Sequence, residues 1–447
     1  MASIHVKSAL TPAGWRRDVR LVITGGQISA LESGVAAQAG DERHDVLVPG
    51  MPNLHSHAFQ RGMAGLAEVR GPGDDSFWSW RTVMYRFALS MTPDHVEAVA
   101  GQLYMEMLEA GFTRVGEFHY LHHDIDGRPY ADVSEMAQRI AAAAALTGMG
   151  LTLLPVFYAH STFGGAAPSE GQRRFINDPE RFSRLLEGCD SVVRGLPGGQ
   201  VGVAPHSLRA VTPDELAAVV AMSEDRPIHM HVAEQVREVE DCIAWSGKRP
   251  VEWLLDNASL DDRWCLIHAT HMTDDETRRM VRSGAVAGLC PITEANLGDG
   301  TFNAKVFADA GGRFGIGSDS NILIGIPDEL RQLEYSQRLL HRSRNVLSEP
   351  GRSTGRALFD GAVDGGGRAL GSPVGIAIGQ RADFVCLRQP DIGSLLDDAV
   401  LDSWIFANGT QPDCVWVAGV KQVEHGRHIR HSEIASRFRG VMAALLA

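Results

Sequence analysis

Eight short apolar runs, each followed by a polar tip and then by a stretch of helical character, constrain the fold of this chain most strongly. Continuous apolar strands that alternate with helices form a parallel sheet covered on both faces. Eight such units over roughly 250–300 residues are typical of a (β/α)8 barrel, so we expect an α/β fold of this TIM-like type. The runs are Val46–Pro52, Thr113–Phe118, Leu151–Tyr158, Gln200–Ala204, Pro227–Val232, Trp264–Ala269, Ala285–Leu289 and Arg313–Gly317.

The two ends of the chain show a different pattern, with short alternating strands and glycine turns such as Gly25-Gly26. We predict that residues 1–45 and 375–447 pair as one small β-sandwich domain. Residues 46–374 would then form the barrel, inserted between the two halves of the sandwich. A swapped pairing of the ends, or two separate caps, are the alternatives.

Two helices of the barrel have clear starts. Thr92 and Thr212 are each followed by proline and aspartate, the pattern of a capping residue before a proline at the first helical position. The first of these helices is expected to run to Ala110, with Gly111 as its stop.

Composition excludes several classes of partner. The chain has 42 basic against 55 acidic residues, a net charge of −13, whereas nucleic-acid-binding surfaces are basic. No apolar run is long enough to span a membrane, and Met1–Leu10 has no signal core, so we expect a cytoplasmic protein. None of the six cysteines forms a Cys-x-x-Cys pair, so neither a disulfide framework nor a zinc ribbon is indicated.

Histidine pairs end the predicted first and fifth strands. His55 and His57 follow the first, at the barrel end where active sites of this fold lie. At a frayed strand end both imidazoles can turn toward one point, although a lone pair could equally be two surface histidines. In the second pair we interpret His229 as a core residue and His231, nearer the strand tip, as the better metal ligand. Glu234, three residues later, can reach the same pocket as a general acid or base.

Two further strands end in residues that can bind metals. His268 ends the sixth strand and Asp319 follows the eighth. Each alone is more often structural than functional, but four of eight strands ending in such residues is an improbable coincidence. Histidines with one carboxylate and an open position for water are typical of a catalytic metal centre. We therefore expect a bound divalent metal ion.

The order of these motifs resembles the amidohydrolase superfamily, and the segment Gly375–Val385 is similar to its return strand into the small domain. By this resemblance Glu234 is the catalytic glutamate, and His268 and Asp319 take the proton of the attacking water. The residues that match the superfamily's metal ligands are His55, His57, His231 and Asp319.

The distribution of lysine indicates how many ions are bound. Some members of that superfamily bridge two metals with a carbamylated lysine from the fourth strand. Here no lysine lies between Lys7 and Lys248, so that bridge is impossible. We expect one ion per chain, as in the deaminase branch, and zinc as its identity, although iron and manganese accept the same ligands.

A narrower resemblance is to the formimidoylglutamate deiminase family, carried by Pro49–Gly65, Glu117–Tyr120, Ala204–Arg209 and Pro291–Gly300. It implies zinc-dependent hydrolysis of N-formimino-L-glutamate to N-formyl-L-glutamate and ammonia, a step of histidine degradation. Relatives are commonly dimers, so the resemblance also implies a homodimer.

A substrate with two carboxylates needs positively charged or hydrogen-bonding partners. Arg209 follows the fourth strand beside His206, and a guanidinium offers the bidentate fork that a carboxylate prefers. By resemblance Gln60, Tyr120, His206 and Arg209 form the substrate pocket, and Arg81 is a further candidate. A surface charge is the alternative interpretation for any single arginine in this arginine-rich chain.

Two other functions compete with this one. An aromatic deaminase of the guanine or cytosine type would share the metal ligands but needs a flat stacking pocket, which Arg209 with His206 argues against. A non-catalytic barrel used as a binding scaffold would be expected to lose ligands, and here every ligand position is filled. A chelator-sensitive release of ammonia would exclude the scaffold.

Overall fold

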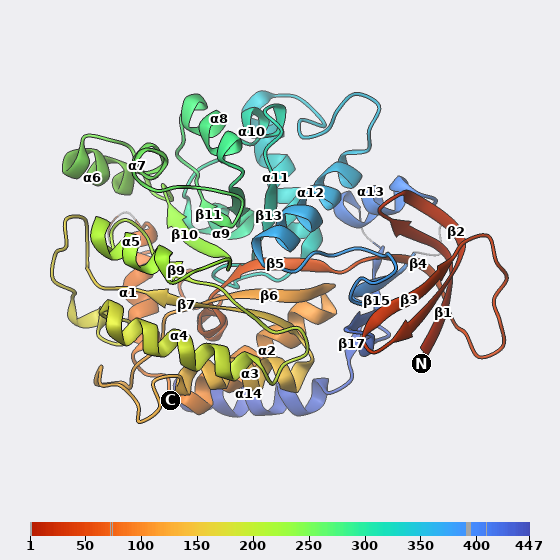
Figure 1. The fold of residues 1–447 in the computed structure, drawn as a ribbon, viewed down its shortest axis with the longest axis horizontal. Helices are drawn as coiled ribbons and strands as arrows, with labels where there is room; N and C mark the ends of the chain where they lie inside the picture. The colour runs from red at the N-terminus through yellow and green to blue at the C-terminus, as the bar shows by residue number, and fades with distance from the viewer. Residues whose placement is uncertain (1, 72, 74, 390–394, 408) are drawn as a thin grey trace.

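The computed structural model describes residues 2–447 except 72, 74, 390–394 and 408. It consists of a barrel with its surrounding helices and a smaller sheet domain at one side of it (Figure 1). Among the described helices, none combines the length and the apolar composition that crossing a bilayer requires.

The barrel strands follow one another around the ring in chain order, with parallel pairing throughout. The last strand pairs with the first through Ile316 and Asn53, and the ring closes on the other side where Val203 bridges to Ile228. The predicted (β/α)8 barrel is confirmed. Its strands are β5 (Met51–Ser56), β6 (Phe112–His119), β7 (Gly150–Phe157), β8 (Gln200–Val201) with β9 (Ala204–Pro205), β10 (Ile228–Val232), β11 (Trp264–His268), β12 (Val286–Leu289) and β13 (Phe314–Ile316).

The first predicted strand, Val46–Pro52, is wrong as a single element. Its first half belongs to β4 (Glu42–Pro49) of the small sheet, and the barrel strand β5 begins only at Met51. Gly50 forms the join, where a Cβ would lie 2.2 Å from the Thr113 hydroxyl, so the backbone must pass close to β6. The run is continuous in sequence because both halves are buried, and burial alone does not reveal the change of sheet.

Helices surround the barrel, and the two predicted helix starts are confirmed. The hydroxyls of Thr92 and Thr212 each accept a hydrogen bond from the backbone N–H three residues later, and proline takes the first helical position in both. The helices are η1 (Ala58–Met63), α1 (Phe77–Ala88), α2 (Pro93–Glu109), α3 (Glu135–Thr147), η2 (Glu170–Gln172), α4 (Pro179–Val193), α5 (Pro213–Ala221), α6 (Val236–Ser246), α7 (Pro250–Asn257), α8 (Asp274–Ser283), α9 (Pro291–Leu297), α10 (Ala304–Asp309), α11 (Ile326–His341), α12 (Thr354–Ala369), α13 (Asp398–Phe406) and α14 (His431–Leu445).

Both ends of the chain build the second sheet, in the order β17-β16-β15-β14-β4-β1-β2-β3. The N-terminal β4 pairs antiparallel with the C-terminal β14, so the two ends form one domain as predicted. Residues from both parts, among them Val6, Leu21, Phe384 and Trp416, share one apolar core. The remaining strands are β1 (Ala2–Thr11), β2 (Gly14–Thr24), β3 (Gln27–Glu32), β14 (Phe384–Arg388), β15 (Gln411–Val417), β16 (Val420–Glu424) and β17 (Arg427–His428).

The domain boundaries at 45/46 and 374/375 stay a prediction. Strand β4 crosses the first of them, and α14 near the C-terminus packs on α2 of the barrel, where Ile434 and Ala435 contact Met105. We therefore propose that residues 1–49 form the N-terminal part of the small domain and that α14 belongs structurally to the barrel.

Candidate active site

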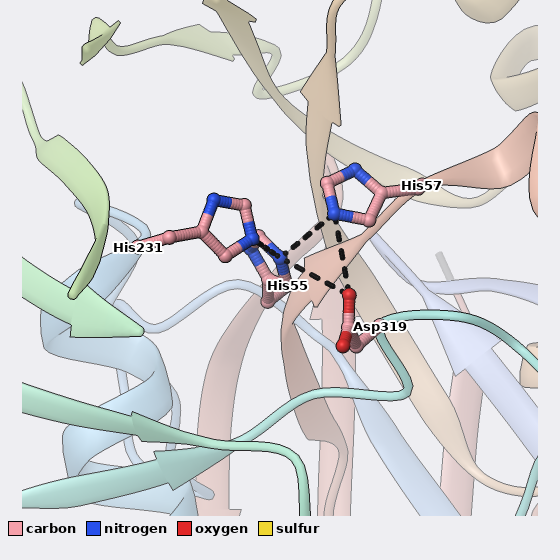
Figure 2. Close-up of side chains that lie close together, drawn as sticks. All are labelled: His55, His57, His231 and Asp319. Atoms are coloured by element: carbon pink, nitrogen blue, oxygen red, sulfur yellow. Dashed lines mark hydrogen bonds and ion pairs between the residues drawn. The ribbon is translucent and has the colours of Figure 1, made fainter. Parts of the chain in front are cut away.

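Four side chains meet at the carboxyl ends of the barrel strands. His55 lies on β5 and His57 directly after it, His231 lies on β10, and Asp319 lies in the loop after β13; all four are buried. Their ligand atoms lie within 4.8 Å of one another, and Figure 2 shows the three imidazoles and the carboxylate turned toward one point. The predicted ligands thus come together in space from three distant parts of the sequence.

Hydrogen bonds fix the orientation of two of the imidazoles. Nδ1 of His57 lies 3.0 Å from the carbonyl of Phe118, and Nδ1 of His231 lies 3.2 Å from the carbonyl of His206. A carbonyl accepts, so each Nδ1 carries the proton and each Nε2 presents its lone pair to the centre. Nε2 of His55 is 3.2 Å from that of His57 and 3.0 Å from that of His231, a convergence of lone pairs that suits a shared cation.

The electrostatics of the cluster also suit a cation. Burial lowers the pKa of His55 to about 3 and that of His231 well below its usual range, so both imidazoles are neutral, as a metal ligand must be. Burial acts to raise the pKa of Asp319, but its close polar contacts with His55 and His57 hold it well below its ordinary value. Three imidazoles and one carboxylate are a donor set that a divalent ion fits.

The loop that carries Asp319 is held by close packing and by a buried polar network. A Cβ on Gly317 would meet the backbone nitrogen of His55 at 2.9 Å, so only glycine allows β13 to approach β5 there. The Asn53 amide donates to the Ser318 hydroxyl at 2.7 Å, and the Asn321 amide donates to the carbonyl of His57 at 3.0 Å. The strained backbone of Asp319, with φ of +46°, is thereby fixed between two strands.

His268 lies between carboxylates next to the four-residue cluster. Its Nε2 is 3.7 Å from Glu234 and 3.8 Å from Asp319, and its Nδ1 is 3.3 Å from Glu294. Burial acts to lower the pKa of His268, but the three carboxylates raise it to about 10. Glu294 was not predicted as a site residue, although it lies within Pro291–Gly300, one of the segments that carry the family resemblance.

Glu234 is buried on the short loop between β10 and α6. Burial raises its pKa to about 7, which suits a group that both accepts and donates a proton near neutral pH. Glu238 supports this loop, because its carboxylate accepts hydrogen bonds from the backbone N–H groups of Ala233 and Glu234 at 3.2 and 3.1 Å. Glu238 was not predicted from the sequence, although its position four residues after Glu234 on an amphipathic helix was an available signal.

A pocket opens from this cluster toward the barrel mouth. All five residues predicted to bind substrate line it, namely Gln60, Arg81, Tyr120, His206 and Arg209, together with His57, His231, Glu234 and Asp319. Five further aromatic side chains complete the wall: Phe77, Trp80, Tyr85, Tyr158 and Phe175. None of these five aromatic residues was predicted from the sequence. Phe77, Trp80 and Tyr85 lie on α1, which is not one of the alternating strand–helix units of the barrel.

Arg209 is the buried positive charge of the pocket. Its side chain is buried, and its Nε has no hydrogen-bond partner among the described residues. Burial acts to lower its pKa, but Glu238 and other neighbours raise it, so the guanidinium stays charged. His206 lies nearby with its ring 4.5 Å from that of Tyr158, and burial lowers its pKa well below the usual range. A buried guanidinium with an unused donor suits an anionic group of a ligand.

The other predicted binding residues are tied to their surroundings. The Gln60 amide donates to the Tyr120 hydroxyl at 2.9 Å and leaves its own carbonyl oxygen without a partner among the described residues. Arg81 lies on α1, where its Nε donates to the Tyr85 hydroxyl at 2.7 Å. The structure therefore brings all five residues to one pocket, with Arg81 held on the helix that covers it.

Comparison with known proteins agrees with this arrangement. The amidohydrolase family profile matches residues 46–421, and the profile of the formimidoylglutamate deiminase HutF N-terminal domain matches residues 1–45. The chain is 50% identical over the full length of both proteins to formimidoylglutamate deiminase of Pseudomonas aeruginosa. The chain belongs to the formimidoylglutamate deiminase family of amidohydrolases.

Solved structures of other proteins have folds similar to that of this chain. An amidohydrolase from Brucella melitensis is 66% identical, covers both chains fully and has a TM-score of 0.99. An adenosine deaminase from Xanthomonas campestris, solved with bound zinc, is 22% identical, covers 100% of this chain and 98% of its own, and has a TM-score of 0.80. The second likeness shows the shared fold alone. As a member of the family, the protein is a hydrolase of carbon–nitrogen bonds, as its motifs predicted.

Proposed function

We propose that the chain hydrolyses N-formimino-L-glutamate to N-formyl-L-glutamate and ammonia. The observation that carries the proposal is the pocket itself, which joins a buried His-His-His-Asp cluster to the buried, partly unpaired guanidinium of Arg209. The cluster suits hydrolysis at a carbon–nitrogen bond, and Arg209 suits a carboxylate held a short distance away. The full-length similarity to a formimidoylglutamate deiminase supports the same substrate.

His55, His57, His231 and Asp319 would hold one divalent ion, with zinc as the proposed metal. A divalent ion held by these residues would supply Lewis-acid chemistry, lowering the pKa of a water molecule toward neutrality. Its charge would also oppose protonation of His268, whose pKa the surrounding carboxylates raise. The absence of any lysine between Lys7 and Lys248 supports a single ion.

The positions of the side chains support the following acid and base roles. His268 and Asp319 face each other at 3.8 Å and would take the proton of the attacking water. As the new carbon–oxygen bond forms at the formimino carbon, Glu234 would pass a proton to the terminal nitrogen, which leaves as ammonia. The carbon–oxygen double bond of the formyl group then forms as the carbon–nitrogen bond breaks, and the proton of the added hydroxyl group returns to Glu234. Glu234 and Asp319 would also balance the positive charge of the substrate amidinium.

Substituting each of the two histidines on β10 tests whether His231 is a metal ligand and His229 a core residue. His231→Gln should reduce the content of tightly bound metal from about one ion per chain to well below that and abolish activity, because a ligand is lost. His229→Gln is the matched control: His229 Nε2 lies 2.7 Å from the carbonyl of Ala369, outside the cluster, and should keep its metal. Elemental analysis of both purified variants decides. Two tightly bound ions in the wild type, or metal loss in His229→Gln alone, would contradict the assignment.

The substrate is tested by measuring ammonia release from N-formimino-L-glutamate, guanine and cytosine side by side. The proposal expects turnover of the first substrate only, and loss of that turnover with a chelator. The aromatic wall of the pocket keeps an aromatic deaminase as the second candidate, and release from guanine or cytosine alone would support it. No ammonia from any substrate, with metal bound, would support the non-catalytic scaffold.

We also propose the cellular setting that the family implies. The protein would act in the cytoplasm as a homodimer in histidine degradation, on a small dicarboxylate substrate and without a nucleic-acid or membrane partner. The net charge of −13 and the absence of a membrane-spanning helix among the described residues support the last two points.

A further inference from the structure

Three arginines lie around a single indole ring at the outer side of the pocket. The guanidinium carbons of Arg81, Arg209 and Arg237 are 5.4, 5.8 and 5.0 Å from the ring centre of Trp78. Trp78 and Arg81 lie on α1, Arg209 follows β9, and Arg237 is in the first turn of α6. These segments lie at the end of the barrel away from the small domain (Figure 1).

The three guanidiniums differ in depth. The Arg237 side chain is 66% exposed, Arg81 is partly buried, and Arg209 is only 5% exposed. Arg81 and Arg209 line the pocket, whereas Trp78 and Arg237 stand outside its lining. The three guanidiniums thus form a path of positive charge from solvent to the buried site, and each of them lies near the indole ring of Trp78.

Arg237 keeps its charge available to solvent. Its acidic neighbour is Asp241, 3.7 Å away on the same helix and 45% exposed, and an exposed pair of this kind is weak. The carboxylates that act on Arg209, Glu238 and Glu234, are buried on the inner side. A cation over an indole face is held by the ring quadrupole, so Trp78 keeps Arg237 at the pocket mouth.

We propose that Arg237, positioned by Trp78, attracts the dicarboxylate substrate to the pocket and passes it inward toward Arg209. This inference rests on the proposed function. N-formimino-L-glutamate has two carboxylates against one amidinium and approaches a protein of net charge −13, which repels it at long range. A local positive path at the mouth offsets that repulsion. N-formimino-glycine has one carboxylate against one amidinium and should gain little from it.

The test is Arg237→Gln measured with both substrates at low and high ionic strength. For the glutamate substrate we expect kcat/KM to fall roughly 3–10-fold at low salt with kcat unchanged, because a charge at the rim acts on association. The loss should shrink at high salt, where exposed charges are screened. The glycine substrate should change by less than a factor of about two, since it has no net charge to attract.

Two further variants make the test specific. Arg278→Gln removes another exposed helix arginine, 51% exposed and 3.3 Å from Asp274 in its own helix, outside the pocket lining. It should leave both substrates unchanged. Trp78→Leu should lower kcat/KM in the same salt-dependent way, and its effect should not add to that of Arg237→Gln, because both act through one contact.

The contrary outcomes are distinct. Equal losses in Arg237→Gln and Arg278→Gln would make the effect one of net charge, and a loss independent of salt or substrate charge would make Arg237 structural; either overturns the inference. A wild-type protein that binds metal but releases no ammonia from N-formimino-L-glutamate would instead overturn the proposed function, before any variant is measured.

Discussion

Replacing Glu234 with glutamine should leave the metal content unchanged and lower kcat roughly 10²–10⁴-fold, the contribution typical of a general acid or base. Glutamine keeps the size of the side chain but can neither take up nor release the proton that the leaving nitrogen needs. Glu234 lies outside the His-His-His-Asp cluster, so the ion does not depend on it. Its pKa of about 7, raised by burial, suits transfer in both directions at neutral pH.

Elemental analysis and steady-state ammonia release on the same preparation measure both parts of this prediction. Glu240→Gln is the matched control, because Glu240 is an exposed glutamate on α6 and should change neither quantity. A Glu234→Gln protein that loses its ion, or that retains near-normal turnover, would show that Glu234 has another role.

Arg209→Met should lower kcat/KM for N-formimino-L-glutamate by two or more orders of magnitude while the metal content stays the same. Methionine keeps much of the bulk but removes the guanidinium, and truncating one side of a buried charge pair costs about 2–5 kcal/mol. The carboxylate left behind would be buried without a partner in a largely aromatic wall. The unpaired Nε of Arg209 is the donor that this carboxylate would use.

N-formimino-glycine shows which carboxylate Arg209 holds. If it holds the side-chain carboxylate, the loss should be far larger for the glutamate substrate than for glycine, which lacks that group. Equal losses would place Arg209 on the α-carboxylate. Unchanged kinetics with both substrates would show that Arg209 does not bind the substrate. Only the assignment as a general deaminase would then remain.

The barrel could be predicted because its strands are buried on both faces. Such strands appear in sequence as continuous apolar runs, and each predicted run from Thr113–Phe118 onward overlaps a barrel strand. The same continuity hid the change of sheet at Gly50, since Val48 and Met51 are equally buried on either side of it. It also gave no sign that the fourth strand divides into β8 and β9.

The segments beyond the barrel repeat were harder to predict. Helix α1 lies in a long connection between β5 and α2, and it supplies Phe77, Trp80 and Tyr85 to the pocket. Nothing in strand periodicity points to these residues, because their position depends on how the connection folds back over the barrel mouth. The contact of α14 with α2 depends in the same way on tertiary packing.

Within the site, residues at strand ends could be predicted and their supports could not. His55 and Asp319 follow apolar runs, His231 lies near the end of one, and parallel strands bring their carboxyl ends to one rim. Glu238 and Glu294 instead lie on helices. Glu238 accepts a hydrogen bond from the backbone of Glu234, and Glu294 contacts the ring of His268. These pairs come together only in the folded chain. A polar residue on the buried face of a helix is the one sequence signal they leave.

The most direct test of the central claim is the identity of the products formed from N-formimino-L-glutamate in water enriched in ¹⁸O. Mass spectrometry should find N-formyl-L-glutamate with one ¹⁸O atom in its formyl group, together with an equal amount of ammonia. Both should disappear when the ion is removed and return when zinc is restored. Formation of L-glutamate and formamide, or turnover that survives complete removal of the metal, would contradict the account.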